Sequence, residues 1–291
     1  MKIVATVNFK GGVGKTTITW LLAKMAALEN KKVLVIDADA QMSLTTALSI
    51  DEGSGQLDRT FEKWYEEKHK RTGRTLLYAI DAYDKWAKGQ CQHFDFPVDN
   101  NLTFEVLPNL HFIPSTEDLY WMELQMFNPS NVKGFISAFS GKLTIRGYDI
   151  VFFDCPPSFT LLSYSVLSNC SLILVPTNPD VFAVRGLRIM MEGLRGWVQP
   201  WPEPKIAVFM NRARGRYAGG HFSAFNETDY FYRQLTTEAN SLSKQNIAKI
   251  DVLKTLIPER AGVRQAISFG GFPVQFRQEF QSLWNEVKAL L

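Results

Sequence analysis

The chain has 291 residues, of which 46% are hydrophobic and 21% are charged, a balance typical of a folded globular protein and unlike that of a disordered one. No apolar run approaches the ~20 residues that a membrane-spanning helix requires, and Met1–Asn8 is too short to supply the apolar core of a signal peptide. The net charge of +3 is too small to indicate a nucleic-acid partner by itself, and three cysteines without metal-ligand spacing argue against a disulfide framework and favour a reducing cytoplasm.

Apolar runs of strand length alternate with helical patterns along most of the chain. Each run is continuous in apolar residues, as in strands buried on both faces of a parallel sheet. We predict strands at Lys2–Val7, Lys32–Ile36, Asp149–Phe153, Leu172–Val175 and Ile206–Met210, and helices at Thr16–Asn30, Met42–Leu48, Asp180–Trp197 and Val274–Leu291. The alternation indicates an α/β fold, with a mostly parallel sheet flanked by helices on both faces.

A polar segment of mixed charge, residues 51–106, interrupts this pattern. It contains two stretches with helical spacing, Leu57–Lys70 and Thr75–Lys88. We interpret the segment as an elaboration of a single domain that spans residues 1–291, because one α/β domain of this size is ordinary.

A glycine-rich segment joins the first predicted strand to the first predicted helix. Its sequence is Lys10-Gly11-Gly12-Val13-Gly14-Lys15-Thr16-Thr17. Glycines allow backbone N–H groups to turn inward around phosphate oxygens, and the following helix presents its positive N-terminal end to the same anion. The phosphate-loop pattern assigns Lys15 to the β- and γ-phosphates and the Thr16 hydroxyl to Mg²⁺, with Thr17 touching the α-phosphate. The alternative, a glycine-rich turn with incidental lysines, is disfavoured by the strand-to-helix context.

Position 9 departs from the common phosphate-loop pattern. The pattern G-x-x-x-x-G-K-[ST] would place glycine there, but the chain has Phe9, followed by Lys10. In this respect the segment resembles the deviant Walker A ATPases of the ParA/MinD group, whose loop reads K-G-G-x-G-K-[ST]-[ST]. The resemblance implies that the chain forms a homodimer with ATP, in which Lys10 reaches across the interface to the phosphates of the partner's ATP. The alternative is a solvated loop lysine.

Two aspartates follow the second predicted strand, where residues 37–41 read Asp-Ala-Asp-Ala-Gln. This segment resembles the family's D-x-D-P-Q switch, with Ala40 in place of proline. The resemblance implies that Asp39 orients the attacking water and that Asp37 helps to arrange the metal shell, since phosphoryl transfer depends on positioning and charge neutralisation. The missing proline removes a fixed φ but no chemistry. The alternative is that one of these aspartates caps the helix predicted at Met42–Leu48.

A third aspartate follows the strand predicted at Asp149–Phe153, in the sequence Asp154-Cys155-Pro156-Pro157-Ser158. This segment resembles the Walker B strand and second switch of the family. The resemblance implies that Asp154, at the carboxyl end of a buried strand, holds Mg²⁺ through water. We interpret Cys155 as a small buried residue and not as a reactive thiol. The expected cofactors are therefore ATP and Mg²⁺.

The nucleobase is indicated by a late strand end that reads Phe209-Met210-Asn211-Arg212-Ala213-Arg214. It lacks the aspartate with which related GTPases read guanine. Asn211 aligns with the family's adenine-reading asparagine, and an amide can both donate to and accept from adenine. Pro258, with Ile257, resembles the family's closing segment beside the nucleotide, as does the stretch from Ala266 to Pro273. We therefore expect ATP and not GTP. The alternative is that Asn211 only caps backbone at a strand end.

Basic side chains gather between Val184 and Arg216, where seven basic residues accompany two acidic ones. The basic residues are Arg185, Arg188, Arg195, Lys205, Arg212, Arg214 and Arg216. Such a patch is the electrostatic footprint of a protein that binds the DNA backbone without reading sequence. The candidate DNA contacts are Arg185, Arg188, Arg212, Arg214 and Arg216. The alternative is an ordinary solvated helix face and loop, because charge runs are usually just exposed.

The resemblance extends over most of the chain and favours the ParA branch of the family. It implies a slow ATPase that partitions or positions a plasmid, a chromosome or a protein assembly. It also implies a ParB-like or cargo-adaptor protein that accelerates hydrolysis, and a cytoplasmic, nucleoid-associated location. An added N-terminal DNA-binding domain is not expected, because the first strand begins at Lys2.

Two other branches of the superfamily fit the sequence less well. A MinD-like protein would bind membrane through its last helix, where Phe280, Leu283, Trp284 and Val287 form part of an apolar stripe. Residues 275–291 have no net charge, however, whereas interfacial helices usually carry a basic face, so we expect the stripe to pack on the sheet and no stable membrane association. A relative of the nitrogenase iron protein would need two cluster-binding cysteines in glycine-rich turns, a setting that Cys91 and Cys170 lack.

Overall fold

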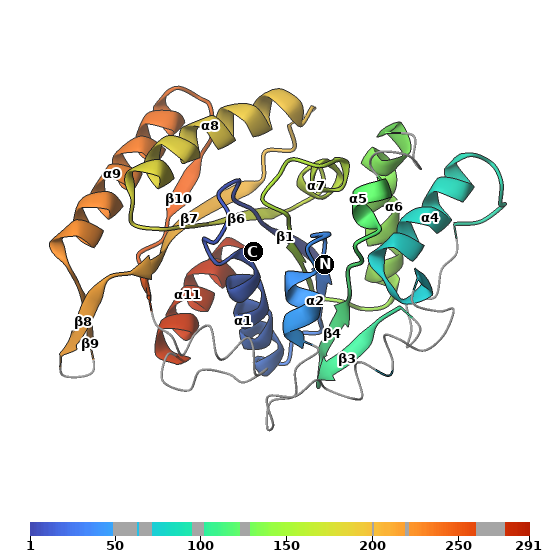
Figure 1. Cartoon of the computed structure of the whole chain (residues 1–291), viewed down its shortest axis with the longest axis horizontal. Helices are drawn as coiled ribbons and strands as arrows, with labels where there is room; N and C mark the ends of the chain where they lie inside the picture. The colour runs from blue at the N-terminus through green and yellow to red at the C-terminus, as the bar shows by residue number, and fades with distance from the viewer. Residues whose placement is uncertain are drawn as a thin grey trace.

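A mostly parallel sheet of nine strands runs through the centre of the described part of the chain (Figure 1). The computed structural model describes residues 1–48, 63, 72–94, 102–122, 129–199, 201–218, 221–259 and 277–291. The strand order is β10-β7-β6-β1-β5-β2-β4-β3, and β11 pairs with β7 outside this row. The strands are β1 Lys2–Thr6, β2 Val33–Asp37, β3 Phe104–Leu107, β4 Leu110–Ile113, β5 Ile150–Asp154, β6 Leu172–Thr177, β7 Lys205–Ala213, β10 Ile250–Val252 and β11 Ile257–Pro258.

The register of the central strands brings polar residues together at one edge of the sheet. All pairings in the sheet are parallel except that of β3 with β4. Asp154, the last residue of β5, lies opposite Thr6 of β1 on one side and opposite Asp37 of β2 on the other. In open α/β sheets ligands bind beyond the carboxyl ends of the strands, so this edge is where a site is expected.

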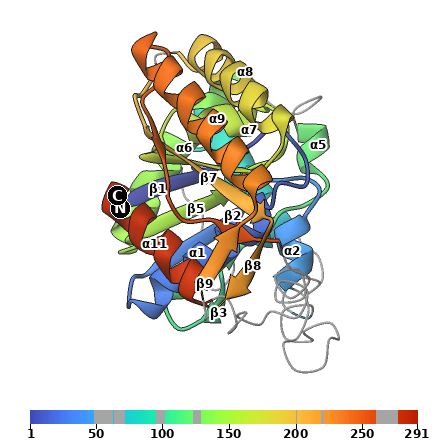
Figure 2. The same cartoon turned by 90° about the vertical axis from the view of Figure 1, so that its left-hand side faces the viewer.

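Helices cover both faces of the sheet, as the sequence predicts (Figure 2). Alternate residues of β2 point to opposite faces: Val33 and Val35 pack with α1 and α11, whereas Leu34 and Ile36 pack with the helices of the other face. The first face carries α1 Lys15–Leu28, α2 Ser43–Leu48 and α11 Arg277–Leu290, and the second carries α4 Leu76–Ala87, α6 Pro129–Ile145, α7 Leu161–Leu167, α8 Val181–Trp197 and α9 Asn226–Lys244. The short helices η1 Thr72–Arg74 and α5 Leu119–Trp121 complete the described elements.

The strands and helices predicted within the described residues are found, with boundaries shifted by a few residues. In the segment 51–106, the second predicted helix corresponds to α4, whose Leu76 and Ile80 are fully buried, and β3 begins at Phe104. The helix predicted at Leu57–Lys70 lies outside the described residues, except for Lys63. Part of this segment therefore belongs to the core of the domain.

Several described elements were not predicted, among them the helices α6, α7 and α9 and the short strands β3 and β10. The antiparallel pair of β8 Gly215–Ala218 with β9 His221–Ala224, which projects from the sheet (Figure 1), was not predicted either. The sequence of α6 contains two glycines and three serines, residues of low helix propensity that obscure its apolar pattern. A side chain at Gly134 would meet the Tyr83 hydroxyl oxygen at 2.4 Å. This glycine thus leaves room for the Tyr83 side chain where α4 packs on α6.

The apolar stripe of α11 faces the interior. Phe280, Leu283, Trp284 and Val287 have no exposed surface, and α11 lies beside α1 on the sheet (Figure 1). The expected packing on the sheet is confirmed for these four residues. No helix among the described residues has the length and hydropathy needed to cross a membrane.

Replacing Leu283 by alanine should therefore lower the free energy of unfolding by about 2–4 kcal/mol, because the substitution leaves a cavity between α11 and α1. Urea denaturation followed by circular dichroism measures this loss. The control is Lys288→Ala on the same helix, which removes a half-exposed ion pair with Glu29 (Nζ to Oε2 2.8 Å) and should cost less than about 1 kcal/mol. Equal effects of the two substitutions would contradict the buried packing of α11.

Candidate functional site

The phosphate loop lies between β1 and α1, at the carboxyl edge of the sheet. Gly12 and Gly14 have φ angles of +73° and +92°, a region that favours glycine. Gly14 is also the N-cap of α1, which has no side-chain capping bond and no acidic residue in its first turn. Since the first backbone N–H groups of a helix lack internal partners, this end of α1 is ready to receive an anion.

Lys15 is the buried cation of the loop. Its side chain extends from the first turn of α1, is almost fully buried, and donates from Nζ to the backbone oxygen of Asn8 at 3.2 Å. Burial lowers the pKa of Lys15, whereas the nearby carboxylates of Asp154 and Asp39 oppose that change. A buried ammonium group is costly unless it is paired, so the site favours an anionic ligand such as phosphate.

Lys10 points toward α8. Its Nζ donates to Asp180 Oδ2 at 2.5 Å and lies 5.6 Å from the ring centre of Phe182. Asp180 is the N-cap of α8, since its side chain also accepts from the Ala183 backbone N–H. The Lys10 side chain is 38% exposed. The sequence located Asp180 at the start of a helix, but its pairing with Lys10, 170 residues away, gave no sequence signal.

Asp154 presents an unpaired carboxylate at the same edge. It is fully buried, and neither of its oxygens has a hydrogen-bond partner in the described part of the chain. Burial and the neighbouring Asp37 raise its pKa well above the ordinary value, while the nearby Thr16 hydroxyl and Lys15 ammonium oppose the increase. A buried carboxylate whose oxygens form no hydrogen bond within 3.5 Å among the described residues, and which lies close to a threonine hydroxyl, fits the hard oxygen ligands that Mg²⁺ prefers. Asp154 and Thr16 are therefore suited to hold the ion predicted from the sequence.

Asp37 is already engaged by the protein. Its Oδ2 accepts from both the backbone N–H and the hydroxyl of Thr45 at 2.8 Å, and its Oδ1 accepts from the Asp39 N–H at 3.1 Å. Burial raises its pKa to about 6, although these hydrogen bonds oppose the increase. Because Thr45 lies in the first turn of α2, the contacts favour the capping role over the metal-shell role. Thr45 was not identified from the sequence.

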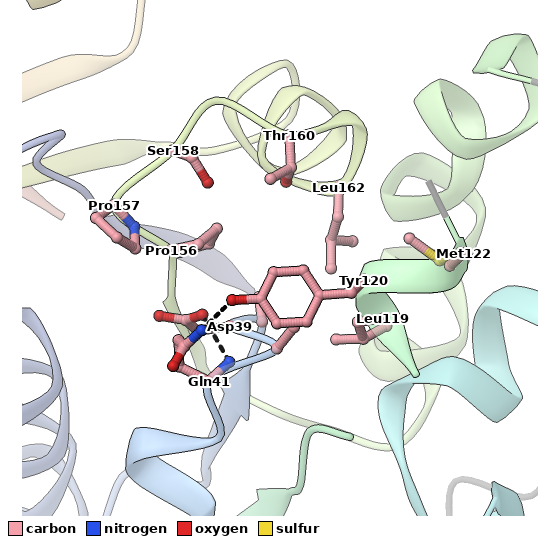
Figure 3. Close-up of a pocket in the computed structure, with 12 residues that line it drawn as sticks. Asp39, Gln41, Leu119, Tyr120, Met122, Pro156, Pro157, Ser158, Thr160 and Leu162 are labelled. Carbon is pink, nitrogen blue, oxygen red and sulfur yellow. Dashed lines mark hydrogen bonds between the residues drawn. The ribbon is translucent and has the colours of Figure 1, made fainter. Parts of the chain in front are cut away.

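Asp39 lies in the wall of a cavity of about 220 Å³ between the two predicted switch segments (Figure 3). Its Oδ1 accepts from the Gln41 backbone N–H at 2.9 Å, and its backbone oxygen accepts from the Ser115 hydroxyl at 2.7 Å. The other walls are formed by Ala38, Ala40, Gln41, Leu119, Tyr120, Met122, Pro156, Pro157, Ser158, Thr160 and Leu162. The carboxylate thus lies on a loop whose backbone is hydrogen-bonded to Ser115, a residue of a distant part of the chain.

Comparison with known proteins identifies the family. A protein-family model described as an AAA domain matches residues 1–199. The chain is 29% identical over 204 residues to the chromosome partitioning protein ParA of Caulobacter vibrioides, a match covering 69% of this chain and 66% of that protein. The chain belongs to the ParA family of P-loop ATPases. It spans between 51% and 61% of the length of several other curated relatives.

Solved structures support the ParA-type fold. An ATP complex of McdA from Cyanothece has a TM-score of 0.71 with 20% identity, covering 100% of this chain and 96% of McdA. The structure of pNOB8 ParA bound to nonspecific DNA has a TM-score of 0.66 with 21% identity, covering 99% and 98%. The central sheet with helices on both faces is therefore the ParA fold predicted from the sequence.

Asn211, near the end of β7, contacts the phosphate loop. Its Nδ2 donates to the Val13 backbone oxygen at 2.7 Å, and a Cβ on Gly14 would lie only 2.3 Å from the same nitrogen. Pro258 of β11 lies alongside, since β11 pairs with the end of β7. Asn211 therefore holds the loop in place, while its carbonyl oxygen and second N–H provide the remaining hydrogen-bonding capacity for a base.

The candidate DNA-contact arginines differ in their surroundings. Arg188 donates to Glu238 Oε1 at 2.5 Å and also contacts Gln245 and Ser241, so its guanidinium joins α8 to α9. Arg214 makes looser ion pairs with Glu227 and Glu259, at 3.8 Å and 3.6 Å. Arg185 and Arg216 are exposed, and Arg212 is half-buried. Within this set, Arg188 has the contacts of a structural residue.

The cysteines agree with the sequence interpretation. Cys155 and Cys170 are buried, Cys91 is exposed, and all three are free thiols. Burial raises the pKa of the Cys170 thiol to about 12 and that of Cys155 well above its ordinary value. Since the thiolate is the metal ligand and nucleophile, these buried thiols have the character of small core residues.

Proposed function

We propose that this chain binds Mg-ATP at the phosphate loop and hydrolyses it slowly, as a ParA-type ATPase that partitions or positions a plasmid, a chromosome or a protein assembly. The observation that carries the proposal is the meeting of three features at one edge of the sheet: an uncapped helix N-terminus behind glycines, the buried Lys15 ammonium, and the unpaired Asp154 carboxylate. The ATP complex of the related McdA fold adds support.

Each residue of the site has a role in this proposal. The backbone N–H groups of the loop bind the β-phosphate, Lys15 neutralises the β- and γ-phosphates, and Thr16 with Asp154 holds Mg²⁺, which supplies further charge neutralisation on the triphosphate. Asp39 orients the attacking water, the role implied by the resemblance of residues 37–41 to the first switch segment of the family. Asn211 and Pro258 flank the adenine end.

Titration calorimetry with Mg-ATP, Mg-GTP and ATP without magnesium tests this assignment. We expect Mg-ATP to bind most tightly, since the chain lacks the guanine-reading aspartate at the strand end beside Asn211. Phosphate release measured on the same sample should be slow. Tighter binding of Mg-GTP, or no uptake of any nucleotide, would contradict the proposal.

The proposed ATP-bound state is a homodimer in which Lys10 contacts the partner's phosphates. Support comes from its exposure, because the Lys10 side chain is 38% exposed and its ion-pair partner Asp180 belongs to the start of α8 and not to the phosphate loop. A cation is well placed wherever triphosphate charge is buried between subunits. Light scattering with and without Mg-ATP tests the dimer. A protomer that remains single at saturating nucleotide would contradict it.

The ATP-bound dimer is proposed to bind DNA without sequence specificity. Its candidate contacts are Arg185, Arg212, Arg214 and Arg216, which carry charge on exposed or half-buried side chains. The related pNOB8 ParA is solved with nonspecific DNA, which supports the proposal. Arg188 is left out because its guanidinium is bound to Glu238.

Replacing Arg212, Arg214 and Arg216 together by alanine should weaken ATP-dependent binding to random duplex DNA and reduce the salt slope of the affinity by about 2–3 per protomer of the dimer, because each arginine neutralises one phosphate. Fluorescence anisotropy at several salt concentrations measures both quantities. The control is Lys205→Ala, a basic residue of the same stretch that lies at the opposite end of β7 and donates to the Leu290 backbone oxygen at 2.7 Å. Unchanged binding by the triple variant would remove the DNA assignment from these residues.

A ParB-like or cargo-adaptor protein is the proposed partner, and the nucleoid in the cytoplasm is the proposed location. Both follow from the family and depend on the ATP-dependent dimer and its DNA binding. A pull-down with the Asp39→Ala variant held in its ATP state tests the partner. Recovery of the same proteins with and without ATP would contradict a partner that recognises the dimer.

A further inference from the structure

The segment that follows β4 contacts the first switch loop at two points. The Ser115 hydroxyl donates to the Asp39 backbone oxygen at 2.7 Å, and the Ser115 backbone N–H donates to the Thr45 hydroxyl at 2.9 Å. Five residues later, the Tyr120 hydroxyl is hydrogen-bonded to the Gln41 side-chain amide, as Figure 3 shows. Ser115 is fully buried, whereas Tyr120 is 51% exposed. The loop is therefore held by two hydrogen-bonding residues of this segment. We call the buried Ser115 the inner anchor and the exposed Tyr120 the outer anchor.

The outer anchor is coupled to the Asp39 carboxylate through one residue. Gln41 binds Tyr120 with its side chain and binds Asp39 Oδ1 with its backbone N–H at 2.9 Å. The inner anchor fixes the same aspartate at its backbone oxygen. The position of the Asp39 carboxylate is consequently set from both ends of the segment 39–41.

The residue between these anchored points is Ala40, in the place of the proline of the D-x-D-P-Q pattern that residues 37–41 resemble. Proline fixes φ near −65°, and alanine does not, so this loop loses a covalent restraint on the backbone that follows Asp39. Hydrogen bonds from outside the loop can supply the missing restraint, since each one removes accessible backbone states.

We propose that Tyr120 is a positioning residue for Asp39 in ATP hydrolysis, acting through Gln41, and that Ser115 is the second anchor. This inference rests on the proposed role of Asp39 as the residue that orients the attacking water. Tyr120 and Ser115 supply a restraint that a proline at position 40 would otherwise impose on the backbone. They act on the hydrolytic step and not on nucleotide binding, because neither belongs to the phosphate loop.

The test compares single-turnover hydrolysis and nucleotide affinity in Tyr120→Phe, Gln41→Ala and the double variant. Each single substitution should lower the hydrolysis rate about fivefold at unchanged affinity for ATP, the effect of losing one positioning hydrogen bond. The double variant should be no slower than the single ones, because both substitutions break the same link. Ser115→Ala should likewise lower the hydrolysis rate and leave the affinity for ATP unchanged. Thermal denaturation checks that this variant is folded.

Two further variants separate positioning from a general structural effect. Ala40→Pro in the Tyr120→Phe background should restore the rate, because it restores the φ restraint without the hydroxyl. Trp121→Phe changes the neighbouring exposed aromatic residue of α5, which does not line the cavity, and should leave the rate unchanged.

Three results would overturn the inference while leaving the proposed function intact: a normal rate in Tyr120→Phe, effects of Tyr120→Phe and Gln41→Ala that multiply in the double variant, or a failure of Ala40→Pro to rescue. A wild-type chain that does not hydrolyse ATP, or an Asp39→Ala variant that hydrolyses it normally, would instead overturn the proposed function, and this inference with it.

Discussion

Replacing Lys15 by alanine should lower the affinity for Mg-ATP by about 10²–10³-fold, roughly 3–4 kcal/mol, because the substitution removes charge-assisted hydrogen bonds to two phosphates. The Lys15 ammonium is almost fully buried at the N-terminus of α1 and has only the Asn8 backbone oxygen as a hydrogen-bond acceptor in the described part of the chain. An incoming triphosphate would therefore gain its strongest single contact there. Titration calorimetry with Mg-ATP measures the loss.

The matched control is Lys10→Ala, which removes the same charge from the same loop. Lys10 is partly exposed and paired with Asp180, so its loss should leave ATP binding by the single protomer nearly unchanged and should prevent the ATP-dependent dimer. Light scattering of the two variants at saturating Mg-ATP separates the roles. If both variants lost nucleotide binding equally, the assignment of Lys10 to the partner's phosphates would be wrong.

The phosphate loop could be predicted from sequence because its geometry is local. The positive φ angles of Gly12 and Gly14 are requirements that glycine meets at those positions, and α1 begins immediately afterwards. The strands were predictable for a similar reason, since burial on both faces makes them continuous apolar runs. In contrast, α6 has an apolar face interrupted by small residues, and Gly134 is explained only by its neighbour Tyr83.

The contacts that define the rest of the site join distant parts of the chain and could not be predicted. The resemblance leads us to expect Asn211 beside adenine, but it does not reveal that the Asn211 amide reaches the Val13 backbone oxygen 198 residues away. Asp37 was expected at the metal, but Thr45 and the Asp39 N–H already occupy its oxygens. Which carboxylate remains free for a cation depends on all the donors around it, and a motif contains only some of them. This is why Asp154 and not Asp37 has the unpaired oxygens.

Replacing Asp39 by alanine should lower the ATP hydrolysis rate by about 10²–10³-fold while leaving ATP affinity within a few-fold of wild type, because the carboxylate positions water and does not bind the triphosphate. The ATP-bound dimer should accumulate as a result, since hydrolysis is the step that ends it. Phosphate release and light scattering on the same sample measure both effects. Asp39→Asn keeps the size of the side chain and should show the same loss, because the amide is a poor acceptor for a water proton.

Asp37→Asn is the matched control on the same loop. The Thr45 backbone N–H and hydroxyl both donate to Asp37 Oδ2, and an asparagine oxygen can keep those two bonds. Its NH₂ group would lose the bond from the Asp39 backbone N–H, and with one of three bonds lost this variant should hydrolyse ATP within about tenfold of wild type. If Asp37→Asn were as inactive as Asp39→Ala, the first aspartate would have a direct role in the chemistry. The hydrogen bonds that make it an anchor of α2 would then account for only part of its function.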